Sequence, residues 1–200
     1  MSVKLYDDAL MKKFKALLHD NRIKIMSPED TMAFFQQLLD TQKDTPITLP
    51  LITLTRGNTI DLEYPHKKMM TFDGAMLDAN ENVSLQLDAI PMTLTYQIDI
   101  YVKEEYQADA YARNFVFSLL NHPKVKVVIP YNNINYEHWS NIRLIPSIED
   151  NSDVPNRLIH DQFTRWSIGF TIDDAYFFSL PYVDNVSIED TELECEEDLG

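Results

Sequence analysis

The stretch TLTYQIDIYVK, from Thr93 to Lys103, decides the fold of this chain. Apolar and polar side chains alternate along it, which places one apolar and one polar face on a β-strand. The period then changes: apolar side chains recur at helical spacing until Asn121-His-Pro ends the pattern. The residues that predict this helix are Ala108, Ala112, Phe115, Val116 and Leu119. With a further strand predicted at Val125 to Ile129, the segment forms one α/β unit of strand, helix and strand.

Two more helices are predicted before this unit. Leu10, Phe14, Leu17 and Leu18 share one face of an amphipathic helix between Asp7 and His19. Ser27-Pro-Glu-Asp is a typical helix start, with Ser27 as N-cap, proline in the first turn and acids at the positive end of the dipole. We therefore expect residues 1–44 to be an N-terminal helical part.

Strands are predicted for much of the remaining chain. Ile47 to Thr55 and Thr59 to Tyr64 indicate a hairpin around the loop Arg56-Gly-Asn58. Asn141 to Ile148 is strand-like, and Thr164 to Asp173 alternates as cleanly as the opening stretch. The expected fold class is α+β: a mixed, mainly antiparallel sheet with helices packed on one face, two N-terminal helices and an acidic C-terminal tail. We expect one structural domain over residues 1–183 and a flexible tail over residues 184–200.

The negative charge is unevenly distributed. The 200 residues carry a formal net charge of −15, with 32 acidic and 17 basic residues. Eight of the acids lie in the last 17 residues, from Asp184 onward, where no basic residue occurs. A protein that binds nucleic acid directly needs a basic face to neutralise phosphates, and the sequence gives no sign of one.

No pattern typical of an active site or a cofactor site occurs. The chain has four glycines and no phosphate-binding loop, and no serine lies in a nucleophile-elbow motif. Its five histidines have no metal-ligand spacing, and Cys195 is its single cysteine, so we expect no zinc site and no internal disulfide. We expect a protein that is not an enzyme and holds no cofactor or metal. No signal peptide or membrane span is predicted, and we expect no membrane partner.

Protein contacts are the function that the residues favour. The segment from Pro130 to Trp139 is predicted to be a loop rich in asparagine and aromatic residues, and exposed aromatic side chains are frequent in protein interfaces. Packing of this loop onto the body of the protein is an equal alternative for its aromatic residues. The candidate interface residues are Arg56, Asn58, Tyr131, Asn132, Asn133, Tyr136 and Trp139.

Several segments of the sequence resemble tail-terminator and tail-completion (neck) proteins of long-tailed bacteriophages. They are YQIDIYVK from Tyr96 to Lys103, the helix from Tyr106 to Leu120, the strand Val125 to Pro130, NSDVPNRL from Asn151 to Leu158, QFTRW from Gln162 to Trp166 and IDDAYF from Ile172 to Phe177. The resemblance covers roughly residues 46–181 and includes no catalytic signature.

This resemblance implies a small virion structural protein that assembles as a homohexameric ring. Such a ring caps the tail tube, and the sheath where one exists, and joins the tail to the neck and connector proteins below the head. The expected location is the tail or neck of the virion, after assembly in the host cytoplasm. DNA would pass through the ring without specific binding, so we expect an acidic inner wall, which repels phosphates.

Two rival functions come from other classes. The charge of −15 also fits an acidic DNA mimic that inhibits a nucleic-acid enzyme, although a mimic usually spreads its charge over a rigid face. An enzyme with a metal-binding carboxylate pair at Asp173-Asp174 is the other rival, against the plainer interpretation of a solvated turn.

Overall fold

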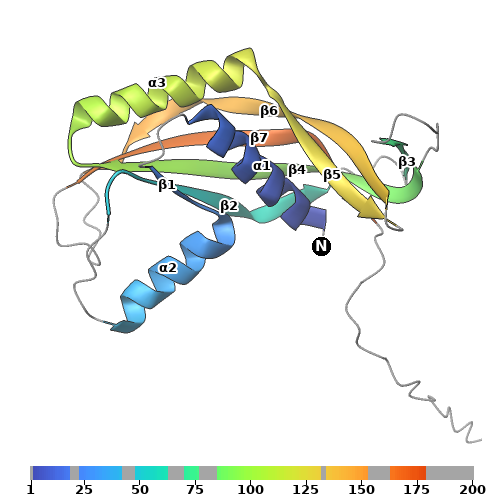
Figure 1. Cartoon of the computed structure of the whole chain (residues 1–200), viewed down its shortest axis with the longest axis horizontal. Coiled ribbons are helices and arrows are strands. Elements are labelled where there is room, and N and C mark those ends of the chain that lie inside the picture. Colours follow the sequence, from blue (N-terminus) through green and yellow to red (C-terminus); the bar gives the residue numbers. More distant parts are fainter. Residues whose placement is uncertain are drawn as a thin grey trace, which may run out of the picture.

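In the computed structural model, residues 2–18, 23–41, 48–62, 70–76, 85–131, 134–152 and 163–178 are described. They form three helices and seven strands (Figure 1). The helices are α1 (Ser2–Leu17), α2 (Pro28–Thr41) and α3 (Glu105–Asn121). The strands are β1 (Lys24–Met26), β2 (Leu51–Leu62), β3 (Met70–Met76), β4 (Leu85–Val102), β5 (Lys124–Tyr131), β6 (Ile134–Asp150) and β7 (Thr164–Phe178). The predicted acidic tail lies outside the described residues.

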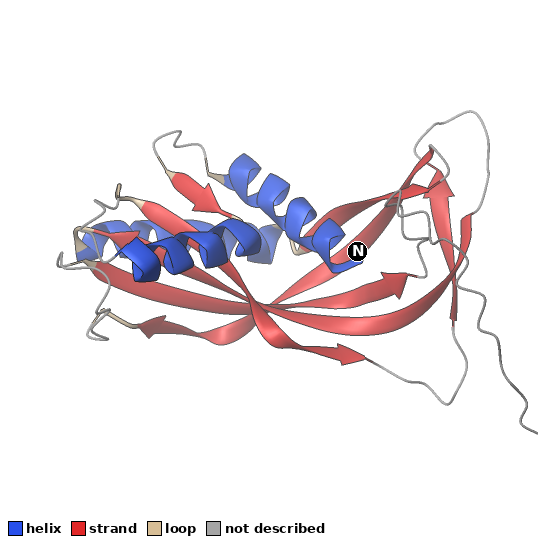
Figure 2. Cartoon of the chain, turned by 90° about the horizontal axis from the view of Figure 1, so that it is seen from below, coloured by secondary structure: helices blue, strands red, loops and turns tan. Residues whose placement is uncertain are grey.

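All seven strands belong to one mixed sheet, and the fold is α+β as the sequence predicts. Strands β1 and β2 are parallel, and the other pairings are antiparallel. β4 pairs with β7, β7 with β6, β6 with β3, and β3 with β4 again. This closed circuit of pairings curls the sheet, and its long strands are strongly twisted (Figure 2).

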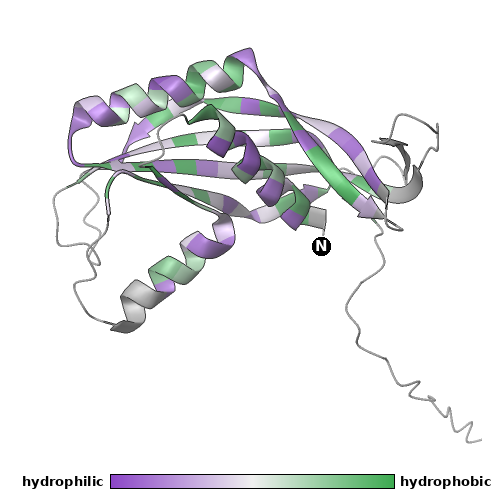
Figure 3. Cartoon of the chain, in the orientation of Figure 1, coloured by the Kyte–Doolittle hydropathy of each residue, from purple (hydrophilic) through white to green (hydrophobic). Residues whose placement is uncertain are grey.

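The opening stretch of the sequence lies in β4, the strand that holds the sheet together. β4 pairs with β2, β3 and β7, and it begins at Leu85, earlier than the predicted Thr93. Green and purple alternate along it in Figure 3, as the period-two pattern predicts. The predicted α/β unit is present as β4, α3 and β5, but β5 pairs with β6 rather than with β4. The unit is therefore held together by α3 and by strands that come later in the chain.

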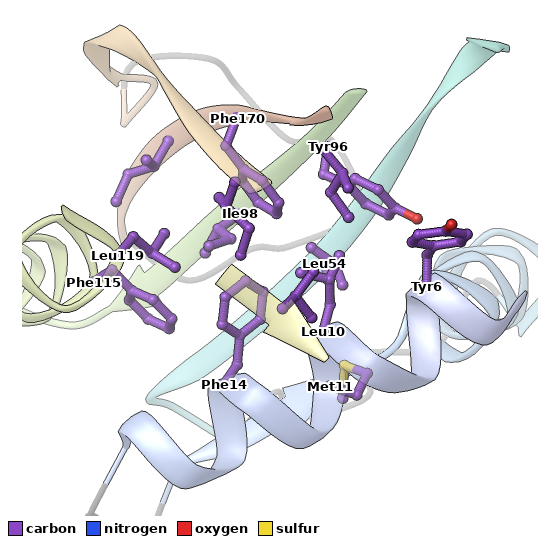
Figure 4. Close-up of a cluster of buried hydrophobic side chains, with 14 of the residues drawn as sticks. Tyr6, Leu10, Met11, Phe14, Leu54, Tyr96, Ile98, Phe115, Leu119 and Phe170 are labelled. Carbon is purple, nitrogen blue, oxygen red and sulfur yellow. The ribbon is translucent and has the colours of Figure 1, made fainter. Parts of the chain in front are cut away.

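The main core lies between one face of the sheet and two helices. The buried stripe of α3 faces β4 and β7. Four of the five residues that the helical period predicts are buried, namely Ala108, Ala112, Phe115 and Leu119, whereas Val116 is only partly buried. From α1, Phe14 inserts between the rings of Phe115 and Phe170, with edge-to-face centroid distances of 5.4 and 5.9 Å (Figure 4). Aromatic pairs in this geometry add to the stabilisation from burial alone.

The third helix, α2, packs elsewhere. Its Phe34 and Phe35 lie against a small separate cluster that contains Met26, Leu51 and Tyr101. Leu51 precedes Ile52, which belongs to the main core, and neighbouring residues on a strand point to opposite faces. The expectation that the helices pack on one face therefore holds for α1 and α3 and is wrong for α2. Ser27 caps α2, since its Oγ accepts a hydrogen bond of 3.1 Å from the backbone N–H of Asp30.

Two predicted loops are strands in the structure. β2 runs without a turn through Arg56, Gly57 and Asn58 and pairs with β4 on both sides of a bulge, so the predicted hairpin is wrong. Glycine and asparagine in this position mark a bulge in one strand, which a turn resembles in sequence. The predicted loop from Pro130 to Trp139 is a hairpin of β5 and β6 instead. Its strands form because each residue finds a cross-strand partner, which local propensity does not reveal.

Candidate functional site

The predicted interface residues do not form one patch. Tyr136 is buried, with 3% of its surface exposed, whereas Trp139 is 53% exposed on β6. Asn58 is exposed beside the β2 bulge. Tyr131 ends β5, and its side chain, together with Asn132 and Asn133, lies outside the described residues. Of the residues placed here, Trp139 is the aromatic side chain that remains free for a partner.

Arg56, also predicted at an interface, takes part in an internal cluster. Its guanidinium lies 2.6 Å from the carboxylate of Asp7 in α1, which also accepts a 2.7 Å hydrogen bond from the Tyr96 hydroxyl. Burial raises the pKa of Asp7, and the hydrogen bond from Tyr96 and the charge of Arg56 oppose that rise. The three residues join α1 to β2 and β4 through side-chain contacts.

A second polar cluster surrounds the bulge of β7. Asp174 has a φ of 56°, and its carbonyl oxygen accepts hydrogen bonds from His138 Nε2 at 2.8 Å and from the Ser140 hydroxyl at 3.1 Å. A carbonyl oxygen only accepts, so Nε2 carries the proton in this arrangement. It cannot then take a proton from Ser140, although Ser140 Oγ lies 3.0 Å away. Ser140 is fully buried, and this Ser–His pair therefore has the geometry of a structural contact.

The Asp173-Asp174 pair is engaged in similar contacts. Arg143 Nε lies 3.0 Å from the Asp173 carboxylate, and Asn141 Nδ2 donates to Asp174 at 2.6 Å. The two carboxylates thus contact different partners on β6. No three potential metal ligands cluster within the described ranges. The enzyme hypothesis gains no support from these contacts.

The opposite face of the sheet holds a buried acid. Asp99 on β4 is 3% exposed and accepts hydrogen bonds from Ser167 at 2.6 Å and from Gln97 at 2.7 Å. Arg165 Nη2 lies 3.2 Å from the same carboxylate. The Arg165 guanidinium also lies 5.6 Å from the centre of the Tyr101 ring. Burial raises the pKa of Tyr101 to about 12, and the negative charge of Asp99 adds to that rise. These contacts fix β4 against β7.

An exposed apolar stripe on α3 is a feature that sequence reasoning missed. Tyr106, Phe117 and Leu120 are 67%, 62% and 60% exposed. Together with the exposed Ala110 and Arg113 they recur in steps of four, three, four and three residues, on the side of α3 away from its buried stripe. We call these five residues the α3 outer stripe. This second row of apolar residues could be found in the sequence, because apolar residues occupy two faces of the predicted helix.

A groove between α1 and β5 is the other surface feature. It has a volume of about 830 Å³, and Lys12 and Lys13 of α1, Lys124 and Lys126 of β5 and Trp139 of β6 line it. Lys13 donates to the carbonyl oxygens of His122 at 2.7 Å and Lys124 at 2.9 Å, and burial lowers the pKa of its ammonium group. The clustering of the lysines arises from the packing of α1 on β5, which residue spacing alone does not predict.

Comparison with models of known protein families and with curated proteins finds no match to this chain. None of the described helices is long and apolar enough to cross a membrane.

Proposed function

We propose that this chain is a virion structural protein, a tail terminator or neck component that acts through protein–protein contacts. In this function, copies of the chain form a ring that caps the tail tube, with the sheath where one exists, and joins it to the connector below the head. The resemblance of the sequence to tail-terminator proteins is the source of this proposal. The position in the virion, the number of subunits in the ring and the partner proteins are proposed on the same basis.

The single observation that supports it best is the α3 outer stripe. Three large apolar side chains, each more than half exposed, lie along one helix face. Phe117 and Leu120 are neighbours on this face, three residues apart, and neighbouring exposed apolar side chains of this kind are typical of protein interaction sites. A helix with apolar residues on both sides is suited to pack on its own sheet with one side and on a neighbouring protein with the other.

A ring needs two different surfaces that meet head to tail. The α3 outer stripe is one candidate. Ile145 and Ile148 on β6 are 40% and 48% exposed and offer a second apolar surface on a different element. We propose that these two surfaces meet between neighbouring copies, with the acidic residues of the chain enriched on the inner wall of the ring.

The test is a capping assay with the tail tube protein of the same phage. The wild-type chain should arrest tube growth, and negative-stain images should show a ring at one tube end. Phe117→Gln/Leu120→Gln should abolish capping while leaving the melting temperature within a few degrees of wild type, since both side chains are exposed. Asn114→Gln on the same helix is the matched control and should cap normally.

Three outcomes would overturn parts of this proposal. If tubes grow to the same lengths with and without the wild-type chain, the tail-terminator function is wrong. If Phe117→Gln/Leu120→Gln caps as well as wild type, the α3 outer stripe is not the assembly surface. A charge map of the assembled ring with a basic channel would contradict the acidic inner wall.

A further inference from the structure

The groove between α1 and β5 combines an apolar floor with a positive rim. Leu5 and Ala9 of α1 and Val125 and Val128 of β5 contribute apolar lining. Figure 1 shows α1 crossing the sheet beside β5. A groove of about 830 Å³ is within the size range of sites that hold a peptide segment or a small ligand.

Positive charge is concentrated here in an otherwise acidic protein. Four lysines and one aspartate, Asp8, line the groove. Neither Lys12 nor Lys124 pairs with a carboxylate among the described residues. Lys126 forms an ion pair with Glu137 and lies 5.9 Å from the centre of the Trp139 ring. With Asp8 in the lining and Glu137 paired to Lys126, the described part of the chain leaves two of the four lysine charges uncompensated.

The sequence contains one segment with the complementary composition. Residues 184–200 hold eight acidic residues and no basic one, and Val186, Ile188 and Leu193 are interspersed among the acids. Such a segment offers carboxylates to a lysine rim and apolar side chains to an apolar floor. Charge complementarity of this kind favours the correct pairing of surfaces.

The last described strand ends beside β6, the strand that carries Trp139, although His138 and Trp139 are neighbours on that strand and point to opposite faces. β7 ends at Phe178, and the ring of Tyr176 lies 5.1 Å from the ring of His138, the residue before Trp139. Five residues separate Phe178 from Asp184. An extended chain covers about 3.3–3.6 Å per residue, so these five span roughly 17 Å. A short tether also gives an effective concentration on the order of millimolar, which favours docking on the same chain.

We propose that the acidic segment from Asp184 to Asp198 docks in the α1–β5 groove of its own chain. Its carboxylates neutralise Lys12 and Lys124, and its apolar residues cover the floor beside Trp139. Docking is sensitive to salt, because ion pairs at an exposed rim are screened over about 8 Å at physiological ionic strength. This inference does not depend on the proposed function.

Carbodiimide cross-linking of the full chain tests the docking directly. This reagent joins a carboxylate to an amine without a spacer, and mass spectrometry of digested monomer identifies the joined residues. Cross-links between Lys12, Lys124 or Lys126 and the acids of residues 184–198 are expected, and 1 M sodium chloride should reduce them at least fivefold. Lys15→Gln/Lys24→Gln, a double variant of exposed lysines outside the groove lining, should leave these cross-links unchanged. An absence of groove-to-tail cross-links in monomer overturns the proposal.

A binding experiment gives independent evidence. In a full-length variant whose eight tail acids are replaced by their amides, the groove should be open. A synthetic peptide of residues 184–200, kept reduced, should change Trp139 fluorescence in that variant and bind wild type at least tenfold more weakly. Adding Lys12→Gln/Lys124→Gln to the variant should weaken peptide binding at least tenfold, whereas Lys15→Gln/Lys24→Gln should not.

Three results would contradict docking on the same chain. Equal peptide binding by wild type and by the amide variant would mean that the groove is open in the wild-type protein. Equal losses from the two lysine double variants would mean non-specific charge attraction. A tail-dependent doubling of the mass in solution, with cross-links confined to the dimer, would assign the segment to the groove of a second copy.

Discussion

The Tyr96 hydroxyl in β4 donates a 2.7 Å hydrogen bond to the carboxylate of Asp7 in α1, across 89 positions of the chain. The ring of Tyr96 stacks on that of Phe170, with 5.5 Å between centroids and 12° between planes. Tyr96 thus contacts the first helix through its hydroxyl and β7 through its ring. Burial, together with the adjacent charge of Asp7, raises the pKa of Tyr96, so the hydroxyl remains a donor at all ordinary pH values.

Removal of Arg56 should expose the cost of burying Asp7. Arg56→Ala leaves the Asp7 carboxylate with Tyr96 but without its cation, and we expect a loss of about 1–3 kcal/mol in the free energy of unfolding at pH 7, since the arginine is one-third exposed. Arg56 opposes the rise of the Asp7 pKa, so its loss raises that pKa further. A raised pKa in the folded state means that folding is favoured by protonation. The deficit should therefore shrink as the pH falls toward about 4, the ordinary pKa of an aspartate.

Urea unfolding between pH 4 and 8 measures this deficit. The same arginine substitution in an Asp7→Asn background is the control, because an amide does not titrate. Its deficit should stay constant with pH. A deficit in the Asp7 background that grows on acidification would contradict the assignment of the raised pKa to Asp7.

Truncation of Asp99 should be among the most destabilising polar changes in the sheet. Asp99→Ala removes the common acceptor of Gln97, Ser167 and Arg165, and we expect a loss of about 2–4 kcal/mol because buried donors are left unsatisfied. Thr95→Ala, four residues earlier on the same face of β4, should cost about 1 kcal/mol or less. Chemical denaturation of both variants gives the comparison. Equal losses would mean that the Asp99 contacts do not contribute net stability.

His138 should make the fold sensitive to mild acid. Burial lowers the pKa of its imidazole, and the hydrogen bond to the Asp174 carbonyl and the charge of Asp174 oppose this only in part. A lowered pKa in the folded state means that the unfolded chain binds the proton more readily. The free energy of unfolding should therefore fall as the pH drops below about 6.5, the ordinary histidine value. His138→Gln should remove this component, which a comparison of thermal unfolding at pH 7.5 and 5.5 detects. An unchanged pH profile in His138→Gln would contradict it.

The backbone conformation of Asp174 lowers the stability of the fold independently of its side chain. Its φ of 56° lies in the left-handed region, which is unfavourable for residues with a Cβ. Both Asp174→Gly and Asp174→Ala remove the carboxylate and its bond to Asn141, so the difference between them reports the backbone alone. We expect the glycine variant to be more stable than the alanine variant by about 1 kcal/mol. The opposite order in melting temperature would mean that the chain leaves this conformation when the carboxylate is absent.

Local patterns in the sequence predicted those elements whose environment repeats regularly. The alternation from Thr93 to Val102 indicated a strand with one buried face, and Leu94, Tyr96, Ile98 and Ile100 are buried as expected. The spacing of Ala108, Ala112, Phe115 and Leu119 indicated the buried face of α3. The same reasoning failed at Arg56 to Asn58 and at Pro130 to Trp139. Glycine and asparagine occur in bulges as well as in turns, and only pairing with a distant strand distinguishes the two.

Most of the candidate sites could not be predicted from the sequence. Trp139 was expected to be exposed at an interface, and its side chain is exposed, but Tyr136 from the same segment is buried. The segment is a strand and not the predicted loop, and strand residues alternate between faces. Its aromatic side chains are therefore buried or exposed according to the face on which they lie. The α3 outer stripe could have been found from its period, whereas its exposure depends on which side of α3 the sheet covers.

By itself, the sequence determined the fold class, the central strand Thr93–Val102 with the helix that follows it, and the acidic composition of residues 184–200. These features depend on local periodicity and composition, and each short stretch of sequence contains both. Only the tertiary structure decided that Arg56 pairs with Asp7, that α2 packs away from the other helices, and that four lysines line one groove in an acidic protein. Each of these depends on contacts between segments far apart in the chain, and the free energy of such contacts comes from burial and pairing that no short stretch specifies.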